Sequence, residues 1–211
     1  MIRRLASFAR DRRGLALVEF ALVMPVLLVL TLTGAEIANY ITVRMRVSQL
    51  ALRVADDAAR IGTGTQLSSK KIYESDINDL FIGANQQSGG LQLSQRARVV
   101  ISDLEPMANP NTTSRYKIVW QRCYGAKTNY VRQYGLAGAT NLTGIGPAGR
   151  QVTAQDDNAT IFVELYYEYQ PLISASLVPE TTFTEIASMA VRDRRDLTQI
   201  YNDNNAPIAS C

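Results

Sequence analysis

The sequence predicts an α+β fold in which a long N-terminal helix precedes a small antiparallel β-sheet domain. Three observations indicate this fold. A run of 21 residues, Leu15–Ala35, is predominantly apolar and carries a single charge, at Glu19. A segment with helical periodicity continues from it to residue 61, and four strand-like stretches occupy the rest of the chain. The length of 211 residues leaves room for one ordinary domain or for a small domain with an appendage.

The predicted helix begins after a basic leader that covers residues 1–14. The leader contains one acidic residue, Asp11, and five arginines: Arg3, Arg4, Arg10, Arg12 and Arg13. Because positive charge next to a membrane span favours the cytoplasmic side, the N-terminus is expected in the cytoplasm. The formal net charge of +3 for the whole chain therefore depends strongly on this short segment.

Residues 15–35 form the first half of the helix and are predicted to span a membrane. At 1.5 Å per residue they cover roughly 30 Å, the thickness of the hydrocarbon core. A cleaved secretory signal is the alternative, but the run is longer than the usual 7–15 residues and no small-x-small cleavage site follows it. Glu19 is unusual here, since a carboxylate in a span is costly unless it finds a partner or reaches the interface.

Residues 36–62 are predicted to continue the helix as an amphipathic segment. Apolar side chains recur every three or four residues, at Tyr40, Val43, Val47, Leu50, Val54, Ala58 and Ile61. This spacing is typical of a helix that packs on a domain core. Gly62 and Gly64 supply a stop signal, so the helix is expected to end at about residue 62.

Residues 63–211 are predicted to form an extracytoplasmic α+β domain. A short helix is predicted over about 70–83, and a turn-rich stretch follows it. Four strands are then predicted over 96–102, 115–123, 159–169 and 182–191. Their spacing suggests an antiparallel sheet. Residues 124–158 form a long loop rich in Gly, Asn and Thr, and loops of this length are usually functional or poorly ordered. The polar tail 201–211 is expected to fray unless something holds it.

Cys123 and Cys211 are the two cysteines of the chain. The predicted topology places both on the oxidising side of the membrane, which favours a disulfide, with two free thiols as the alternative. The bond would close a loop of about 90 residues, worth on the order of 4–5 kcal/mol in the loop-entropy model. It would also hold the tail against the second strand.

The residue types argue against catalysis. The chain contains no histidine, which excludes Ser-His-Asp and Cys-His nucleophiles and imidazole metal ligands. It also lacks a phosphate-binding glycine loop and a nucleophile elbow. The sequence therefore predicts a protein that is not an enzyme and needs neither cofactor nor metal. The charge run Arg192–Asp196 is interpreted as a salt-bridged face rather than a nucleic-acid site.

The segment Arg12-Arg13-Gly14-Leu15-Ala16-Leu17-Val18-Glu19-Phe20 resembles the class III signal of type IV pilin-like proteins. The resemblance implies that a prepilin peptidase cuts between Gly14 and Leu15 and leaves the apolar helix as the new N-terminus. It further implies that Glu19 aids assembly by pairing with the new α-amino group, its own or a neighbour's. A carboxylate and an ammonium in a medium of low dielectric compensate each other's desolvation.

Within that family the opening of the helix, the central Pro25 and the distal part of about 150 residues resemble TadE/TadG-type minor pseudopilins of the tight-adherence (Flp) system. Phe20 stands where a tyrosine often follows the glutamate in Flp major pilins. The resemblance implies a pilin-like fold and assembly with other pilins and pseudopilins on a pilus platform. It also implies an inner-membrane protein with a single span, whose distal domain is periplasmic or extracellular and which enters a surface pilus.

Three other interpretations stay open at this point. In the first, residues 15–35 serve only as the anchor of a binding or adhesion module. In the second, the chain is a secretion-system pseudopilin. A third interpretation is an adhesive pilus tip that uses the 124–158 loop. Cleavage after Gly14 would remove five of 22 basic and one of 19 acidic residues, which leaves 17 basic and 18 acidic side chains. The net side-chain charge would then be −1, so no nucleic-acid partner is expected.

Overall fold

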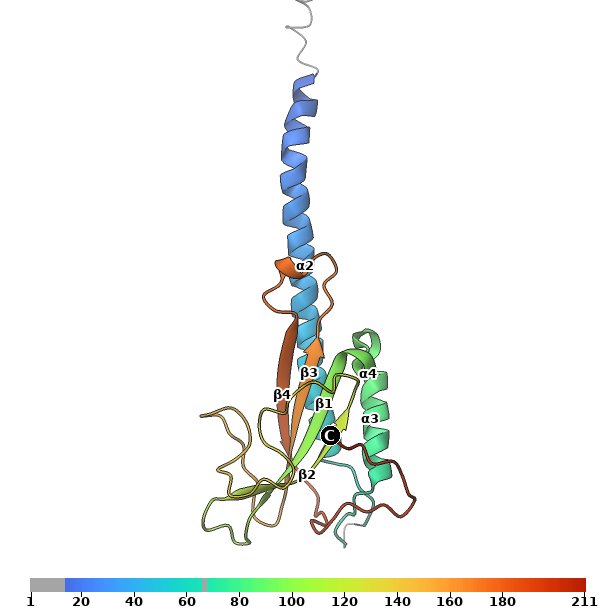
Figure 1. Ribbon diagram of the computed structural model, residues 1–211, viewed down its shortest axis with the longest axis vertical. Coiled ribbons are helices and arrows are strands. Elements are labelled where there is room, and N and C mark those ends of the chain that lie inside the picture. The colour runs from blue at the N-terminus through green and yellow to red at the C-terminus, as the bar shows by residue number, and fades with distance from the viewer. Residues whose placement is uncertain (1–13, 66–67) are drawn as a thin grey trace, which may run out of the picture. The chain divides into compact units, whose positions relative to one another are not determined.

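The computed structural model describes residues 14–65 and 68–211, so the basic leader 1–13 lies outside the described residues. The described residues form a long α-helix, two shorter α-helices and a four-stranded antiparallel sheet, which confirms the predicted α+β fold (Figure 1). The helices are α2 (Leu15–Ala58), α3 (Glu74–Ser88) and α4 (Leu93–Arg96). The strands are β1 (Ala97–Pro106), β2 (Tyr116–Tyr124), β3 (Thr160–Glu168) and β4 (Thr182–Ala190).

The described chain divides into two compact units. The first, called the helix unit, contains residues 14–41 and the loop 170–179 that connects β3 to β4. The second, called the sheet unit, contains residues 42–65, 68–169 and 180–211. Helix α2 thus contributes its first half to one unit and its second half to the other.

Helix α2 forms because its residues are predominantly apolar helix formers with few interruptions. Pro25 lies inside the helix without ending it, as is tolerated in membrane helices. The Thr31 hydroxyl lies 2.8 Å from the Leu27 carbonyl oxygen and 3.0 Å from that of Leu28, so this polar group is satisfied within the helix. The helix ends at Ala58, four residues before the predicted end at Gly62.

The sheet has the strand order β2-β1-β3-β4, with every neighbouring pair antiparallel. The central strands β1 and β3 are buried along most of their length, whereas β4 at one edge is mostly more exposed, with Phe183 and Ala187 buried. A register shift between Ser102 and Leu104 interrupts the β1–β2 pairing. All four predicted strands are present, each with its ends within four residues of the prediction.

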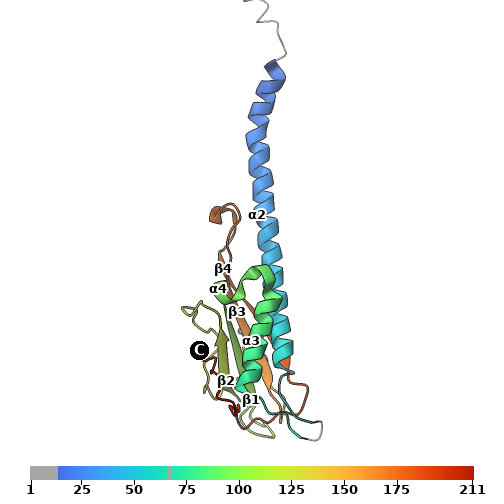
Figure 2. The same cartoon turned by 90° about the vertical axis from the view of Figure 1, so that its right-hand side faces the viewer.

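One face of the sheet is covered by helices. The Phe81 ring of α3 stacks on Tyr124 of β2, with centroids 5.3 Å apart. The Arg44 guanidinium of α2 lies over the Phe183 ring of β4, 5.5 Å from its centroid. Figure 2 shows α3 beside the second half of α2 at this face. The apolar stripe predicted for α2 is buried here, with Val47 and Val54 at most 1% exposed.

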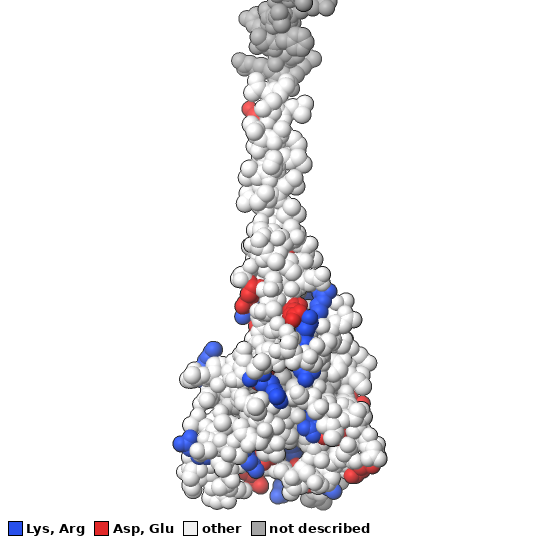
Figure 3. Space-filling model, in the orientation of Figure 1, with Lys and Arg blue, Asp and Glu red and all other residues white. Residues whose placement is uncertain are grey.

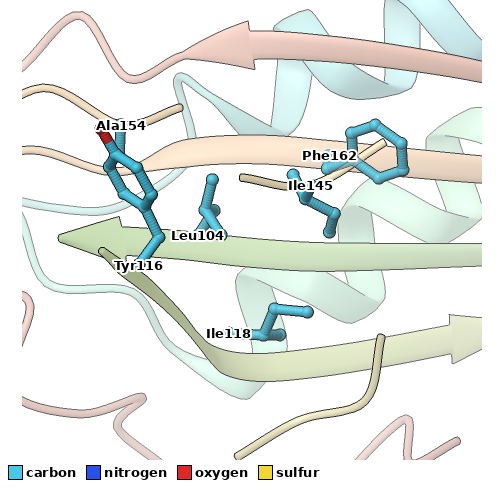
Figure 4. Packing of buried hydrophobic residues seen from close by; sticks show 6 residues of the cluster. All are labelled: Leu104, Tyr116, Ile118, Ile145, Ala154 and Phe162. Atoms are coloured by element: carbon cyan, nitrogen blue, oxygen red, sulfur yellow. The ribbon is translucent and has the colours of Figure 1, made fainter. Parts of the chain in front are cut away.

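The other face of the sheet is covered by the long loop between β2 and β3. Ile145 and Ala154 from the loop join Leu104, Tyr116, Ile118 and Phe162 from the strands in one hydrophobic cluster (Figure 4). The Tyr134 ring meets Phe162 edge-on, with centroids 5.4 Å apart. The sequence predicted that this loop is either functional or poorly ordered. In the structure it forms a layer of the sheet unit.

Candidate assembly site

The predicted processing site lies at the very start of the described chain. Gly14 is exposed, and a Cβ atom built on it meets no heavy atom within 4 Å among the described residues. Leu15 is the first residue of α2 and is 54% exposed. The bond between these two residues therefore lies at an exposed position at the start of α2.

Glu19 and Phe20 lie one turn into the helix. Glu19 follows Leu15 by four residues, so the two side chains share a helix face with Cβ atoms about 5–6 Å apart. Glu19 is exposed, and it forms no ion pair or hydrogen bond with any residue that the structure describes. Phe20 is 59% exposed beside it. Both side chains are thus available to groups outside the described part of this chain.

The surface of the first half of α2 is apolar on every side. Residues 15–35 carry one charged side chain, Glu19, and Figure 3 shows this stretch almost free of blue and red atoms. Leu17 and Leu22 are 72% and 71% exposed, and Leu30 is 63% exposed. Among the described helices, α2 is the one that is long and apolar enough to cross a membrane. An apolar surface without a covering layer suits lipid or the helices of other subunits.

Glu36 is a second acidic residue of the helix unit, and sequence reasoning assigned it no role. It is fully buried and accepts two backbone hydrogen bonds from the β3–β4 loop. The Leu172 nitrogen donates to Oε1 at 3.3 Å, and the Ile173 nitrogen donates to Oε2 at 2.6 Å. The signal in the sequence is its position, since Glu36 is the first charged residue after the apolar run.

The two cysteines form a disulfide that holds the C-terminal tail. Cys123 of β2 bonds to Cys211 with their Cα atoms 4.9 Å apart. The Cys123 nitrogen also donates to the Ala209 carbonyl at 2.8 Å, and the Asn78 amide donates to the Pro207 carbonyl at 2.8 Å. The tail is therefore tied to both β2 and α3 rather than frayed.

The charge run Arg192–Asp196 is a salt-bridged face only in part. Asp193 pairs with Lys70 at 2.6 Å and Arg192 approaches Asp56 at 3.6 Å, as expected for such a face. Arg195 differs, because it is buried and donates to the carbonyl oxygens of Ala58 at 3.0 Å and Ile61 at 3.1 Å. It thereby caps the end of α2, so Arg195 does not belong to the expected salt-bridged face.

Arg195 also lies in a cluster of buried ionisable groups in the sheet unit. Asp103 and Glu105 of β1 line a cavity of about 350 Å³ together with Arg195. Burial raises the pKa of the Asp103 carboxyl well above its ordinary value, and the neighbouring Glu105 raises it further. One Asp103 oxygen and two Arg195 nitrogens have no hydrogen-bond partner among the described protein atoms. The raised pKa means that Asp103 holds its proton to a higher pH than an exposed carboxyl does.

A second buried carboxylate holds the long loop against the sheet. Glu164 of β3 accepts hydrogen bonds from the Tyr130 hydroxyl at 2.8 Å and the Gln133 nitrogen at 3.0 Å. Burial raises the pKa of Glu164, although these hydrogen bonds lower it in part. The described residues contain no group of three or more His, Cys, Asp or Glu side chains placed to bind a metal ion. Glu164 therefore joins β3 to the loop through hydrogen bonds to Tyr130 and Gln133.

Comparison with known proteins concerns the long helix. No curated protein and no solved structure matches the chain. One family model does match, over residues 14–60, and its description is TadE-like protein. The match begins at the glycine of the predicted processing site and ends just after α2, so it covers this helix and leaves the sheet outside. Residues 14–60 are therefore similar to the TadE-like family, in agreement with the resemblance seen in the sequence.

Proposed function

We propose that this protein is a minor pilin or pseudopilin of a tight-adherence (Flp) pilus. Prepilin peptidase cuts it after Gly14, and the mature chain takes part in initiating, capping or extending the pilus through helix packing. The observation that carries this proposal is the first half of α2. It begins at Leu15, exposes apolar side chains on every side and carries Glu19 as its single charge over residues 15–35.

The position of Glu19 supports a role in assembly. After cleavage, Leu15 bears a free α-amino group, and Glu19 lies one helical turn away on the same face. An unpaired carboxylate at the centre of a span costs about 3 kcal/mol on insertion scales. Pairing with an ammonium removes much of that cost. A small axial shift between neighbouring subunits would bring the Glu19 of one chain to the amino group of the next.

The same helix supports a defined membrane topology. The arginine-rich leader remains in the cytoplasm, residues 15–35 span the inner membrane, and the sheet unit lies on the periplasmic or extracellular side. The Cys123–Cys211 disulfide suits that oxidising side. The partners in this proposal are prepilin peptidase, other pilins and pseudopilins, and the assembly platform.

The cleavage is tested by producing the full chain with and without prepilin peptidase and measuring its intact mass without reductant. The expected mature protein lacks residues 1–14 and the two thiol hydrogens of Cys123 and Cys211. Gly14→Val should block the cut, because a side chain then occupies the position before the scissile bond. An intact Met1 in the presence of active peptidase would favour the anchored binding module instead.

The role of Glu19 is tested by pilus formation in cells that carry Glu19→Ala, Glu19→Gln or Thr31→Ala. Thr31 is the matched control, because it is another polar residue of the span whose hydroxyl bonds only within the helix among the described residues. We expect both Glu19 variants to insert in the membrane but to assemble poorly, and Thr31→Ala to assemble normally. Normal pili from Glu19→Gln would contradict charge pairing.

Neighbouring genes for secretion components would favour a secretion-system pseudopilin.

A further inference from the structure

The β3–β4 loop of the helix unit has an unusual composition. Residues 170–179 read QPLISASLVP and contain no charged side chain. Leu172 is 68% exposed and Ile173 is 44% exposed at the tip of the loop. Exposed large apolar residues next to each other on an uncharged loop indicate contact with a surface other than water.

The loop is held at one level of helix α2. Glu36 accepts hydrogen bonds from the backbone nitrogens of both Leu172 and Ile173, at 3.3 Å and 2.6 Å. These two bonds fix the backbone of the tip, while the side chains remain exposed. A buried carboxylate needs such donors, since its desolvation is otherwise uncompensated. Glu36 therefore positions the loop.

The level at which the loop is held coincides with the end of the predicted span. Glu36 directly follows residues 15–35, whose length matches a hydrocarbon core of about 30 Å. The next charged residue of α2 is Arg44, eight residues or about 12 Å farther along the helix. If residues 15–35 span the membrane, the loop residues bonded to Glu36 stand at the level of the headgroup layer, from which apolar side chains can reach the acyl chains.

We infer that Leu172 and Ile173 insert into the outer boundary of the lipid bilayer and form a second membrane contact beside the α2 span. This inference rests on the membrane span of the proposed function. The contact fixes the depth of the helix before the protein enters a pilus. It also couples β3 and β4, which flank the loop, to the membrane surface.

The experiment uses the full chain in phosphatidylcholine vesicles with tryptophan as the reporter. Trp120 is the one tryptophan of the chain, so Trp120→Phe provides a background for Leu172→Trp. Val131→Trp is the matched control, because Val131 is an exposed apolar residue of the sheet unit. If Trp120→Phe destabilises the fold, Trp120 is retained and the spectrum of the parent is subtracted.

We expect lipids brominated near the headgroup to quench L172W strongly and lipids brominated at the chain ends to quench it less. Iodide in the water should quench V131W but not L172W. Adding Glu36→Ala should reduce the lipid quenching of L172W towards the V131W level, whereas Glu180→Gln, an acidic control next to the loop, should leave it unchanged. Flotation of every variant with the vesicles separately verifies the α2 span.

Two results would overturn the inference. In the first, iodide quenches L172W as strongly as V131W while the protein still floats with the vesicles. In the second, neither brominated lipid quenches L172W, and its protection from iodide disappears when the protein is diluted in lipid. The second result would assign the loop to contact with another copy of the chain. A failure of cleavage after Gly14 would contradict the proposed function but not this inference, because the inference depends only on the membrane span of α2.

Discussion

The two halves of helix α2 contain similar apolar residues but bury them very differently. Val29 and Leu30 in the first half are both 63% exposed, whereas Val47 and Leu50 in the second half are 0% and 4% exposed. Both halves are regular helix. The difference arises because the sheet unit covers one face of residues 42–58, while no described element covers the apolar surface of residues 15–32.

This comparison shows where each half obtains its stability. Burial of a valine or leucine side chain contributes about 1.5–3 kcal/mol, and in the second half that contribution comes from within the chain. The apolar side chains of the first half can gain a similar free energy of burial, but under the proposed function they gain it only from lipid or from the helices of other subunits. The sequence pattern reflects this division, because charges return to the helix only from Glu36 onward.

The largest expected effect comes from placing a carboxylate in the buried half. Val47→Asp should destabilise the sheet unit by on the order of 4 kcal/mol, because the charge has no partner in the core. Val29→Asp is the matched change in the exposed half. It should leave the unfolding of the sheet unit unchanged and cost about 3 kcal/mol in membrane insertion. Circular dichroism during thermal unfolding and vesicle flotation measure the two effects, and an unfolded sheet unit in V29D would break the comparison.

The disulfide gives the next largest effect, and it is confined to the sheet unit. Replacing Cys123 and Cys211 by serine should lower the free energy of unfolding by about 2–4 kcal/mol. The disulfide links residues 88 positions apart, and without it the unfolded chain gains conformational entropy. Denaturant unfolding with and without reductant measures this loss. Reductant should destabilise the parent and leave the double-serine variant unchanged. Impaired membrane insertion of that variant would show that the two regions depend on each other.

Removing the Arg195 cap should have a smaller effect, at the end of the buried half. Arg195→Met keeps much of the side-chain length but loses the hydrogen bonds to the carbonyls of Ala58 and Ile61. We expect a loss of about 2 kcal/mol, which is typical for hydrogen bonds from a charged group. Arg194→Met is the control, because Arg194 is exposed. Equal unfolding midpoints in urea for R194M and R195M would contradict the capping role.

The sequence predicted the elements with strong local patterns. The apolar run, the periodic stripe around Val47 and the alternating strands each repeat within a few residues, so their helices and strands are recognisable without tertiary contacts. The end of α2 was misplaced because Gly62 is a local signal, whereas the actual end at Ala58 is capped by Arg195, a distant residue.

The features that the sequence did not reveal depend on contacts between distant segments. Ile145 lies in a stretch rich in Gly and Asn, yet it is 1% exposed because the loop folds over the sheet. Glu36 is recognisable as a positioning residue only after the β3–β4 loop is seen against it.

A consequence for the adhesive-tip interpretation is that deleting residues 124–158 would uncover the core. Substituting exposed loop residues such as Val131 is the cleaner test.

The smallest expected effect concerns pH and distinguishes buried from exposed charge within the sheet unit. Burial raises the pKa of Asp103, so the folded state holds this proton more tightly than the unfolded state does. As the pH rises from the ordinary carboxyl pKa to the raised one, the parent should therefore lose stability relative to Asp103→Asn. Glu105, Arg195 and Lys117 are the charged groups that act on Asp103, and the two cations offset the shift only in part.

Asp193 provides a control of opposite sign. It is exposed, and the hydrogen bond and charge of Lys70 lower its pKa. Its contribution is therefore present above the ordinary carboxyl pKa and is lost as the pH falls through the lowered value. Urea unfolding of the parent, D103N and D193N at a series of pH values on both sides of the ordinary carboxyl pKa measures the two effects. If the stability difference between parent and D103N does not fall as the pH rises, then Asp103 is not held in the protonated, water-excluded environment that distinguishes the sheet unit from the open surface of the helix.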